Sequence, residues 1–373
     1  MTKKIFNLSM FMDRFCKMIH NSPDFWIKMG NFESRCLRDD MDQLKIEKPI
    51  YVTGLARSGS SILLEILSRF DGVVSHRYSD FPPVFTLYWW NFFLKWVIFK
   101  KIEPAERAHQ DGIFVTPDSP EAMEEVFWMA FFKDVHNIEV SNVIDGNTSN
   151  LDFETFYKDH ILKLLLTRNG NRYLAKANYN ITRLEYILKI FPDARFIIPM
   201  RDPVDQIKSL IKQHLLFCKG QEEEPRATSY LKNIGHFEFG LDFRPINCGD
   251  THQNLNIKNM LQGNKYITGW ARYWNQIYGY IGNRLMENEA LKKAAMIVEY
   301  ETFCKSPVKI IELMRKHCDL PEDKALLLEY ETKIKPPDYY KMEFSQKDLE
   351  IIKNETQKTL QLFEGLRLTE DLR

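Results

Sequence analysis

The feature that most constrains the fold is a glycine-rich turn between a short strand and a helix. Residues 49–54 (PIYVTG) combine β-branched and aromatic residues and end at a glycine, which is typical of a buried strand. From Ile62 to Phe70 the apolar residues recur with helical spacing instead. The turn between them, residues 54–61 (GLARSGSS), can direct several backbone N–H groups toward one point. Because the following helix N-terminus adds about half a positive charge, the segment is suited to bind phosphate or sulfate.

The turn resembles the P-loop that holds nucleotide phosphates. Gly54 and Gly59 occupy both glycine positions of the pattern G-x-x-x-x-G-K-[ST], and Ser61 occupies the hydroxyl position. Ser60 stands where the pattern has lysine, and Arg57 supplies a cation earlier in the turn. The absent lysine normally holds the β- and γ-phosphates, so ATP or GTP hydrolysis is disfavoured, whereas Arg57 can grip a sulfonate. A glycine-rich turn without a ligand is the alternative for this segment alone.

A second stretch, RDPVDQIKS, begins at Arg201 and ends at Ser209. Residues 195–200 (RFIIPM) indicate a buried strand, and Asp202 and Pro203 are typical of an N-cap and a first helical position. Arg201 is therefore expected at the strand end, with Ser209 two turns into the helix. An arginine fork and a hydroxyl can bind a terminal phosphate. Taken alone, the stretch could equally be a capped helix with an arginine paired to a carboxylate.

Strands and helices alternate along much of the chain. Helices are predicted after Ser119 and Pro120 and from a capping box of Thr182 and Glu185, and residues 295–298 (AMIV) resume a strand. This alternation predicts an α/β fold, with a parallel central sheet flanked by helices and ligands at the carboxyl ends of the strands.

The predicted domain organisation has two parts. Residues 1–48 are expected to form a helical N-terminal extension, since their apolar residues show helical spacing. Residues 49–373 are expected to form a single domain with a mostly helical insertion at about 84–150. A loop-rich excursion at about 220–264 is expected near the active site, because binding residues concentrate on loops.

Together the two motifs resemble the 5'-phosphosulfate loop and the 3'-phosphate motif of the sulfotransferases, above all bacterial members whose loop cation is arginine. The resemblance covers about residues 49–303. It implies a P-loop-like fold and a donor, 3'-phosphoadenosine 5'-phosphosulfate (PAPS), that is bound at both phosphate ends without a metal. The residues that it assigns to donor binding are Gly54, Arg57, Ser58, Gly59, Ser60 and Ser61 at the 5' end, and Arg201 and Ser209 at the 3' end.

Two further similarities are less specific. Lys176 in YLAKANYN is similar to a lysine that family members place beside the transferring sulfonate, although Ala177 and Asn178 replace the family's proline-containing context. With Arg57, it is expected to balance charge on the leaving phosphate. Tyr300 in IVEYETF resembles a tyrosine that supports the nucleotide, and a core tyrosine is the alternative.

Sulfuryl transfer also needs a base that takes the proton of the acceptor. The segment VVSHRYSDFPP offers Asp80 as first choice and His76 as second, because a neighbouring strand end would bring it near the glycine-rich turn. A helix cap is the alternative for Asp80, and a buried structural imidazole for His76. His109 and His236 are weaker candidates, since histidines of surface loops rarely take part in catalysis.

Composition limits the partners. Lys plus Arg and Asp plus Glu both total 51, so no net charge attracts nucleic acid. The six cysteines lack zinc or redox spacing and the N-terminus lacks a signal-peptide pattern, which together predict a cytoplasmic protein.

Residues 84–99 are strongly apolar and aromatic but shorter than the roughly 20 residues of a bilayer crossing. They are expected to form a buried or pocket-lining helix or, alternatively, a peripheral membrane contact.

The predicted function is transfer of a sulfuryl group from PAPS to a hydroxyl or amine of a small-molecule, glycan or lipid acceptor. One alternative is a P-loop-type nucleotide-dependent kinase or phosphotransferase, which would need a lysine and an acidic magnesium ligand that the motifs lack. The other is a non-catalytic scaffold that binds adenosine phosphates. Ser60 in place of the lysine, and the absence of a glutamate from the segment that holds Asp80, favour this last reading.

Overall fold

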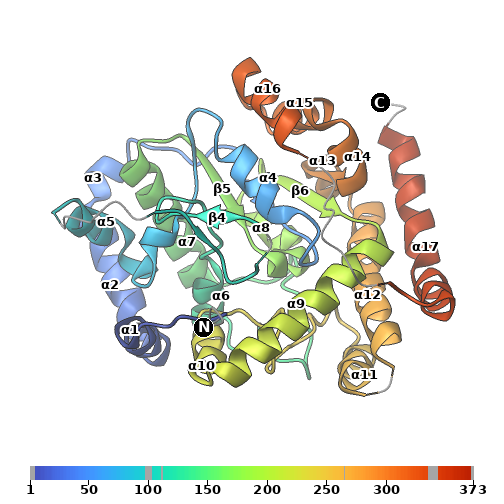
Figure 1. Cartoon of the computed structure of the whole chain (residues 1–373). Helices are drawn as coiled ribbons and strands as arrows, with labels where there is room; N and C mark the ends of the chain where they lie inside the picture. The colour runs from blue at the N-terminus through green and yellow to red at the C-terminus, as the bar shows by residue number, and fades with distance from the viewer. Residues whose placement is uncertain (1–4, 97–102, 111, 264, 335–342, 371–373) are drawn as a thin grey trace.

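A computed structural model describes residues 5–96, 103–110, 112–263, 265–334 and 343–370, and a parallel β-sheet forms its centre (Figure 1). The five strands lie in the order β2–β5–β1–β6–β7, and every neighbouring pair is parallel. Their bounds are β1 Ile50–Val52, β2 Val73–Val74, β5 Arg172–Lys176, β6 Arg195–Met200 and β7 Ala295–Glu299. A short antiparallel hairpin lies apart from this sheet and comprises β3 Ala105–Glu106 and β4 Phe114–Val115. The predicted parallel α/β architecture is thus confirmed.

Helices cover both faces of the sheet, and an N-terminal group of helices lies to one side of it (Figure 1). The N-terminal group comprises α1 Met10–Asn21, α2 Pro23–Cys36 and α3 Arg38–Met41, as expected for a helical extension. The helices that follow as far as β6 are α4 Ser60–Leu67, α5 Leu87–Trp96, α6 Glu125–Phe131, α7 Leu151–Arg168 and α8 Leu184–Ile190. Those after β6 are α9 Pro203–Glu223, α10 Arg226–Asn233, α11 Thr251–Gln262, α12 Tyr266–Glu287, α13 Glu289–Ala294, α14 Tyr300–Lys305, α15 Pro307–His317, α16 Lys324–Lys333 and α17 Gln346–Glu370.

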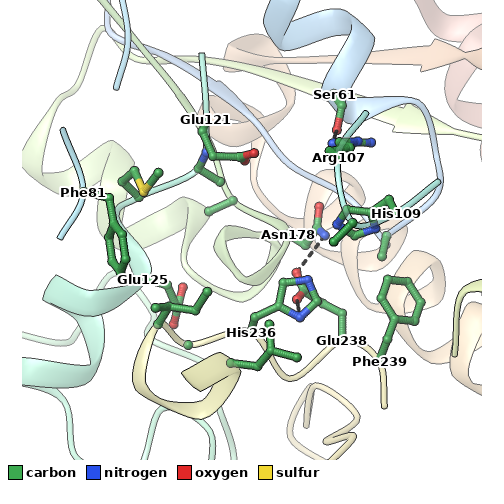
Figure 2. A pocket seen from close by; sticks show the side chains of 18 of the residues that line it. Ser61, Phe81, Arg107, His109, Glu121, Glu125, Asn178, His236, Glu238 and Phe239 are labelled. Carbon is green, nitrogen blue, oxygen red and sulfur yellow. Dashed lines mark hydrogen bonds and ion pairs between the residues drawn. The ribbon is translucent and has the colours of Figure 1, made fainter. Parts of the chain in front are cut away.

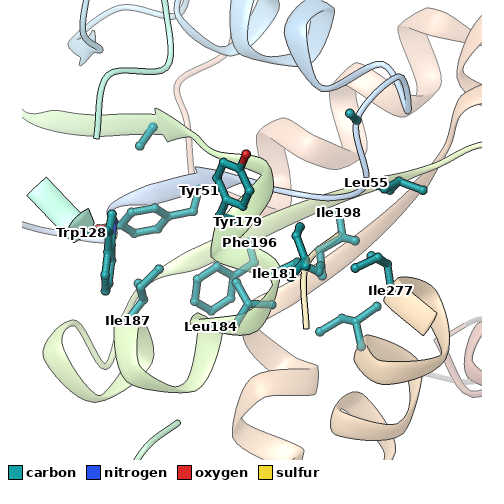
Figure 3. Close-up of a cluster of buried hydrophobic side chains, with 14 of the residues drawn as sticks. Tyr51, Leu55, Trp128, Tyr179, Ile181, Leu184, Ile187, Phe196, Ile198 and Ile277 are labelled. Atoms are coloured by element: carbon teal, nitrogen blue, oxygen red, sulfur yellow. The ribbon is translucent and has the colours of Figure 1, made fainter. Parts of the chain in front are cut away.

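Each strand contributes side chains to both layers of the core. Tyr51 of β1 packs in the larger cluster, with residues of α7, α8 and α12, whereas Ile50 and Val52 pack with α4, α15 and α16 on the other face. Strand β6 alternates in the same way, with Phe196 and Ile198 on the first face (Figure 3). This period of two explains why the central strands appear as continuous apolar runs in the sequence, since both faces are buried.

Two predicted helix starts are wrong. No helix begins at Ser119 and Pro120, because Pro120 pairs with Arg77 in an isolated bridge and α6 starts only at Glu125. The capping box of Thr182 and Glu185 does not form either. Thr182 ends a 3₁₀ turn and its hydroxyl donates to the carbonyl of Tyr179, so α8 starts two residues later without a side-chain cap.

The structure also describes most of two other segments whose character was predicted from the sequence, residues 84–99 and 220–264. The apolar stretch 84–99 forms a 3₁₀ turn, η2 Val84–Thr86, followed by α5, and its residues 97–99 lie outside the described residues. The interval 220–264, expected to be rich in loops, contains the end of α9 and all of α10 and α11. Its longest irregular stretch is residues 234–250, and residue 264 lies outside the described residues.

Candidate active site

The two anion-binding motifs predicted from the sequence meet at the carboxyl edge of the sheet. Strands β1 and β6 are neighbours, with Tyr51 opposite Phe196, so the segments that follow them emerge side by side. The Arg57 Nε donates to Ser209 Oγ over 3.0 Å. Gln206 of α9 adds a second link, because its buried amide donates to the carbonyl of Ala56 at 2.9 Å. The RDPVDQIKS segment therefore buttresses the glycine-rich turn directly.

The glycine-rich turn has the backbone of an anion-binding nest. Arg57 and Gly59 both have positive φ, 66° and 99°, and α4 begins immediately afterwards with Ser60 and Ser61. Successive N–H groups of such a turn point to the inside of the curve, and those at the start of α4 have no intrahelical acceptor. A phosphate or sulfonate would satisfy them.

Tyr300 connects the turn to the arginine of the second motif. A Cβ atom added at Gly59 would come within 2.6 Å of the Tyr300 ring, so only glycine allows this close approach. The guanidinium of the buried Arg201 lies over the same ring, 5.0 Å from its centroid. Tyr300 follows β7, which is the neighbour of β6. Three adjacent strand ends thus contribute to one site.

A cavity of about 470 Å³ opens beside the turn. Arg57, Ser60 and Ser61 line it, together with Lys176, which ends β5 opposite Val52 of β1. Arg107 also lines the cavity, and its Nη1 donates to Ser61 Oγ at 3.1 Å. Several cations therefore surround the point at which the turn faces the cavity. The remaining wall is largely apolar and aromatic.

Asp80 and His76 are buried and do not line the cavity. The Asp80 carboxylate accepts hydrogen bonds from the Arg77 backbone N–H, Asn91 and Arg168. Burial alone would raise the pKa of Asp80, but His76 and Arg168 outweigh it and hold the pKa well below its usual range. The His76 Nε2 lies 3.0 Å from Nε2 of the buried His160, and its Nδ1 lies 3.5 Å from Asp80. Their surroundings are those of a structural ion pair.

A histidine and a glutamate form a pair inside the cavity (Figure 2). The His236 Nδ1 lies 3.2 Å from Glu238 Oε2, and Asn178 Nδ2 donates to Glu238 Oε1 at 3.0 Å. Asn178 lies two residues after Lys176, so the end of β5 supplies both a cation and the group that orients Glu238. His236 Nδ1 and Glu238 Oε2 make no hydrogen bond at this distance, so their contact is an ion pair only when the imidazole is protonated. A small rotation that brought Nδ1–H onto the carboxylate would orient the ring as in a catalytic triad and leave the other ring nitrogen able to accept a proton.

The other carboxylates of the cavity wall have different environments. Burial raises the pKa of Glu124, whose oxygens accept hydrogen bonds from Tyr157, Tyr173 and Asn180. Burial also opposes ionisation of Glu125, but Arg183 and His136 lower its pKa to about 2. Glu121 is half-buried, and its Oε1 accepts the N–H of Ala122 at 2.7 Å. Glu121 lies across the cavity from His236 (Figure 2).

Comparison with known families agrees with this geometry. Residues 49–230 match the model described as the sulfotransferase family. This part of the chain belongs to the sulfotransferase family. The match contains the glycine-rich turn, Lys176 and the whole RDPVDQIKS segment. No curated protein sequence matched the chain.

Solved sulfotransferases align over most of the chain at low identity. Sulfotransferase STF9 from Mycobacterium avium is 13% identical, with a TM-score of 0.49 and coverage of 88% of this chain and 80% of that one. STF1 from Mycobacterium tuberculosis is 12% identical, with a TM-score of 0.45 and coverage of 88% and 82%. A sulfotransferase from Alicyclobacillus acidocaldarius is 11% identical, with a TM-score of 0.41 and coverage of 86% and 96%.

Several residues of the candidate site were missed by the sequence analysis or, like His236, ranked only as weaker candidates. Arg107 lies in the β3–β4 hairpin, within an interval that showed no motif, and Gln206 lies inside a motif in which only the arginine and serine were singled out. His236 and Glu238 have a spacing of two residues, which only the fold turns into a pair facing a cavity. A histidine and an acid two residues apart in a polar loop were the available hint.

Within the ranges that the structure describes, no group of three or more His, Cys, Asp or Glu side chains is arranged to hold a metal ion. A search of the same ranges found no helix with the length and apolar character needed to cross a bilayer.

Proposed function

We propose that this sulfotransferase-family protein transfers a sulfuryl group from PAPS to a hydroxyl or amine of a small acceptor bound in the cavity. The observation that carries the proposal is the hydrogen bond of 3.0 Å between Arg57 and Ser209. It joins the turn suited to one phosphate end to the segment suited to the other, so that one bisphosphorylated nucleotide can contact both.

At the donor, the N–H groups of the turn and Arg57 would bind the 5'-phosphosulfate, and Arg201 and Ser209 the 3'-phosphate. Gly59 and Tyr300 fit this donor site. The Tyr300 ring packs closely against Gly59 of the turn, and the Arg201 guanidinium stacks over the same ring, so one side chain contacts both anion-binding segments. Arg57 and Lys176 lie where negative charge grows on the leaving phosphate oxygen. A fixed cation at such a place stabilises the transition state more than the ground state.

At the acceptor, His236 would take the proton as the acceptor oxygen attacks sulfur. The new bond forms between that oxygen and sulfur, and the bond between sulfur and the 5'-phosphate oxygen breaks. Glu238 would hold Nδ1 of His236 protonated, so that Nε2 faces the acceptor. This proposal moves the base from Asp80 and His76, which do not reach the cavity, to a residue that does.

The walls of the cavity indicate the chemical class of the acceptor. Phe6, Met12, Phe81, Met123, Phe217 and Phe239 give the cavity a mainly apolar lining. His236, Glu238 and the cations are its polar side. A molecule with an apolar body and one hydroxyl fits better than a glycan, whose many hydroxyls would lose hydrogen bonds to water. A cytoplasmic location is part of the proposal, because all six cysteines are free thiols.

Thermal unfolding in the presence of nucleotides tests the donor assignment. We expect 3'-phosphoadenosine 5'-phosphate (PAP), the product nucleotide, to stabilise the protein by about 2.7 kcal/mol at 100 times its Kd. ADP with magnesium is expected to stabilise it much less, because Ser60 replaces the lysine that binds a β-phosphate. Selective stabilisation by ADP with magnesium would support a kinase instead. A response to PAP without transfer to any compound of a cell extract would support a binding scaffold.

A further inference from the structure

Exposed aromatic side chains gather on three helices outside the cavity. Among the described residues, six of the seven exposed Phe and Trp side chains belong to α1, α2 and α5. They are Phe11, Phe25, Phe32, Phe92, Phe93 and Trp96, of which Trp96 is 76% exposed. We call the exposed side of these helices the aromatic face. A concentration of exposed apolar side chains of this kind is typical of a surface that binds another protein or a membrane.

Cations alternate with the aromatic residues along each helix. On α2, Phe25, Lys28, Phe32 and Arg35 are all exposed and follow helical spacing, so they form one stripe. The guanidinium of Arg35 lies over the Phe32 ring, 5.7 Å from its centroid.

A similar order of residue types recurs on the other two helices. On α1 it is Phe11, Arg14 and Met18, all exposed, with methionine in place of the second aromatic residue. On α5 it appears as Phe92, Lys95 and Trp96, which are exposed as well.

The aromatic face is basic although the chain as a whole is neutral. The exposed charged residues of α1, α2 and α5 that the structure describes are five cations and one acid: Arg14, Lys17, Lys28, Arg35 and Lys95 against Asp24. The full sequence has 51 residues of each sign. Interleaved aromatic and basic residues are typical of surfaces that lie at the boundary of an anionic bilayer.

Ring contacts and a buried ion pair hold the three helices together. The rings of Phe15 on α1 and Trp26 on α2 are 6.1 Å apart, and those of Phe32 on α2 and Trp89 on α5 are 5.7 Å apart. Glu33 of α2 accepts the backbone N–H of Trp89 at 2.7 Å and pairs with Lys163 of α7 at 2.8 Å. The helices lie together at one side of the molecule (Figure 1).

We propose that the aromatic face docks on an anionic lipid surface. The same helices reach the cavity, since Met12 of α1 lines it beside the exposed Phe11. On α5, Trp90 Nε1 donates at 2.7 Å to the carbonyl of Ser79, next to cavity residue Tyr78. A docked molecule would therefore hold the cavity close to the bilayer. That an acceptor enters from the lipid rests on the proposed function, whereas docking itself does not.

Co-sedimentation with vesicles tests the docking. Full-length protein is expected to bind vesicles of phosphatidylcholine and phosphatidylserine at least about 10-fold more than vesicles of phosphatidylcholine alone, and to lose binding in high salt. The double variant Lys28→Glu/Arg35→Glu is expected to lose this binding. A matched double variant on α17, Lys353→Glu/Lys358→Glu, changes charge equally at exposed positions elsewhere and is expected to bind like wild type.

Three outcomes would overturn the proposal. These are absence of binding to either vesicle, equal loss of binding in both double variants, or a dimer of wild type that Lys28→Glu/Arg35→Glu dissociates. The last result would show that a second copy covers the face. Stabilisation by PAP is measured on the same samples, so that misfolding and failure of the donor assignment are each seen separately from failure of docking.

Discussion

Replacement of His236 by alanine is expected to lower kcat by about 10²- to 10⁴-fold while the affinity for PAP stays close to that of wild type. His236 lines the cavity beside the cations and is paired with Glu238, which Asn178 holds in turn. Loss of the imidazole removes the proposed proton acceptor but leaves unchanged the proposed donor-binding residues, which follow β1, β6 and β7. The measurement is turnover of PAPS with an acceptor identified by the gain of a sulfonate in a cell extract.

Three comparisons make this result specific. His252→Ala, on α11 and outside the cavity, is expected to keep wild-type kcat. Added imidazole is expected to restore part of the activity of His236→Ala, which a loss of folding would not allow. Glu238→Gln is expected to lower kcat to a smaller extent, because the base remains but loses its orientation. Wild-type kcat in His236→Ala, with a large loss in Glu121→Gln, would assign the base to Glu121.

The variant Asp80→Asn is expected to lower the free energy of unfolding by about 3–5 kcal/mol, with little change in kcat per folded molecule. Asp80 is fully buried, and the side chain of Arg168 that pairs with it is only 8% exposed. Removal of the negative charge leaves that guanidinium buried without a counter-ion. Chemical denaturation and turnover are measured on the same preparation.

The pH dependence of stability provides a second readout for Asp80. Its pKa in the folded protein lies below that of the unfolded chain, because His76 and Arg168 outweigh the opposing effect of burial. The contribution of ionised Asp80 to the free energy of unfolding is therefore fully present above about pH 4, the ordinary pKa of aspartate. This contribution is lost as the pH falls below that value. Asp80→Asn is expected to remove this part of the acid sensitivity.

Asp118→Asn is the matched control for Asp80. Asp118 pairs with Arg77 at 3.2 Å, but its side chain is 80% exposed, so its loss is expected to cost at most about 1 kcal/mol. Unchanged stability of Asp80→Asn together with a fall in kcat of about 10² or more would show that Asp80 acts chemically, as the sequence first suggested.

The sequence predicted the parts of the fold that depend on local patterns. The strand, turn and helix around residues 50–67, and the strand and capped helix around Asp202, are found as expected because apolar periodicity and N-caps are local signals. The sequence also predicted that the two motifs meet, because each follows a strand and parallel strands end at one edge of a sheet. In the structure this meeting includes the hydrogen bond between Arg57 and Ser209.

The acceptor side was not predictable in the same way. The segment with His76 and Asp80 follows β2, which lies beyond β5 and not beside β1, and these two side chains turn into the core. His236 and Glu238 reach the cavity because a loop between α10 and α11 folds back on Asn178, about 60 residues earlier in the chain. No spacing in the sequence encodes that contact. From the sequence alone, the buried pair of His76 and Asp80 cannot be distinguished from the candidate catalytic pair of His236 and Glu238. Only the fold shows that the second pair lines the cavity.

The measurement that tests the account most directly is the affinity of PAP relative to adenosine 5'-monophosphate, determined by titration calorimetry. If both motifs form one donor site, wild type should bind PAP about 10- to 100-fold more tightly, the value of a charged hydrogen-bonded contact with the 3'-phosphate. In Arg201→Ala the ratio should fall toward one. Equal affinities of wild type for the two nucleotides, or a ratio that Arg201→Ala leaves unchanged, would contradict a donor site built from both segments.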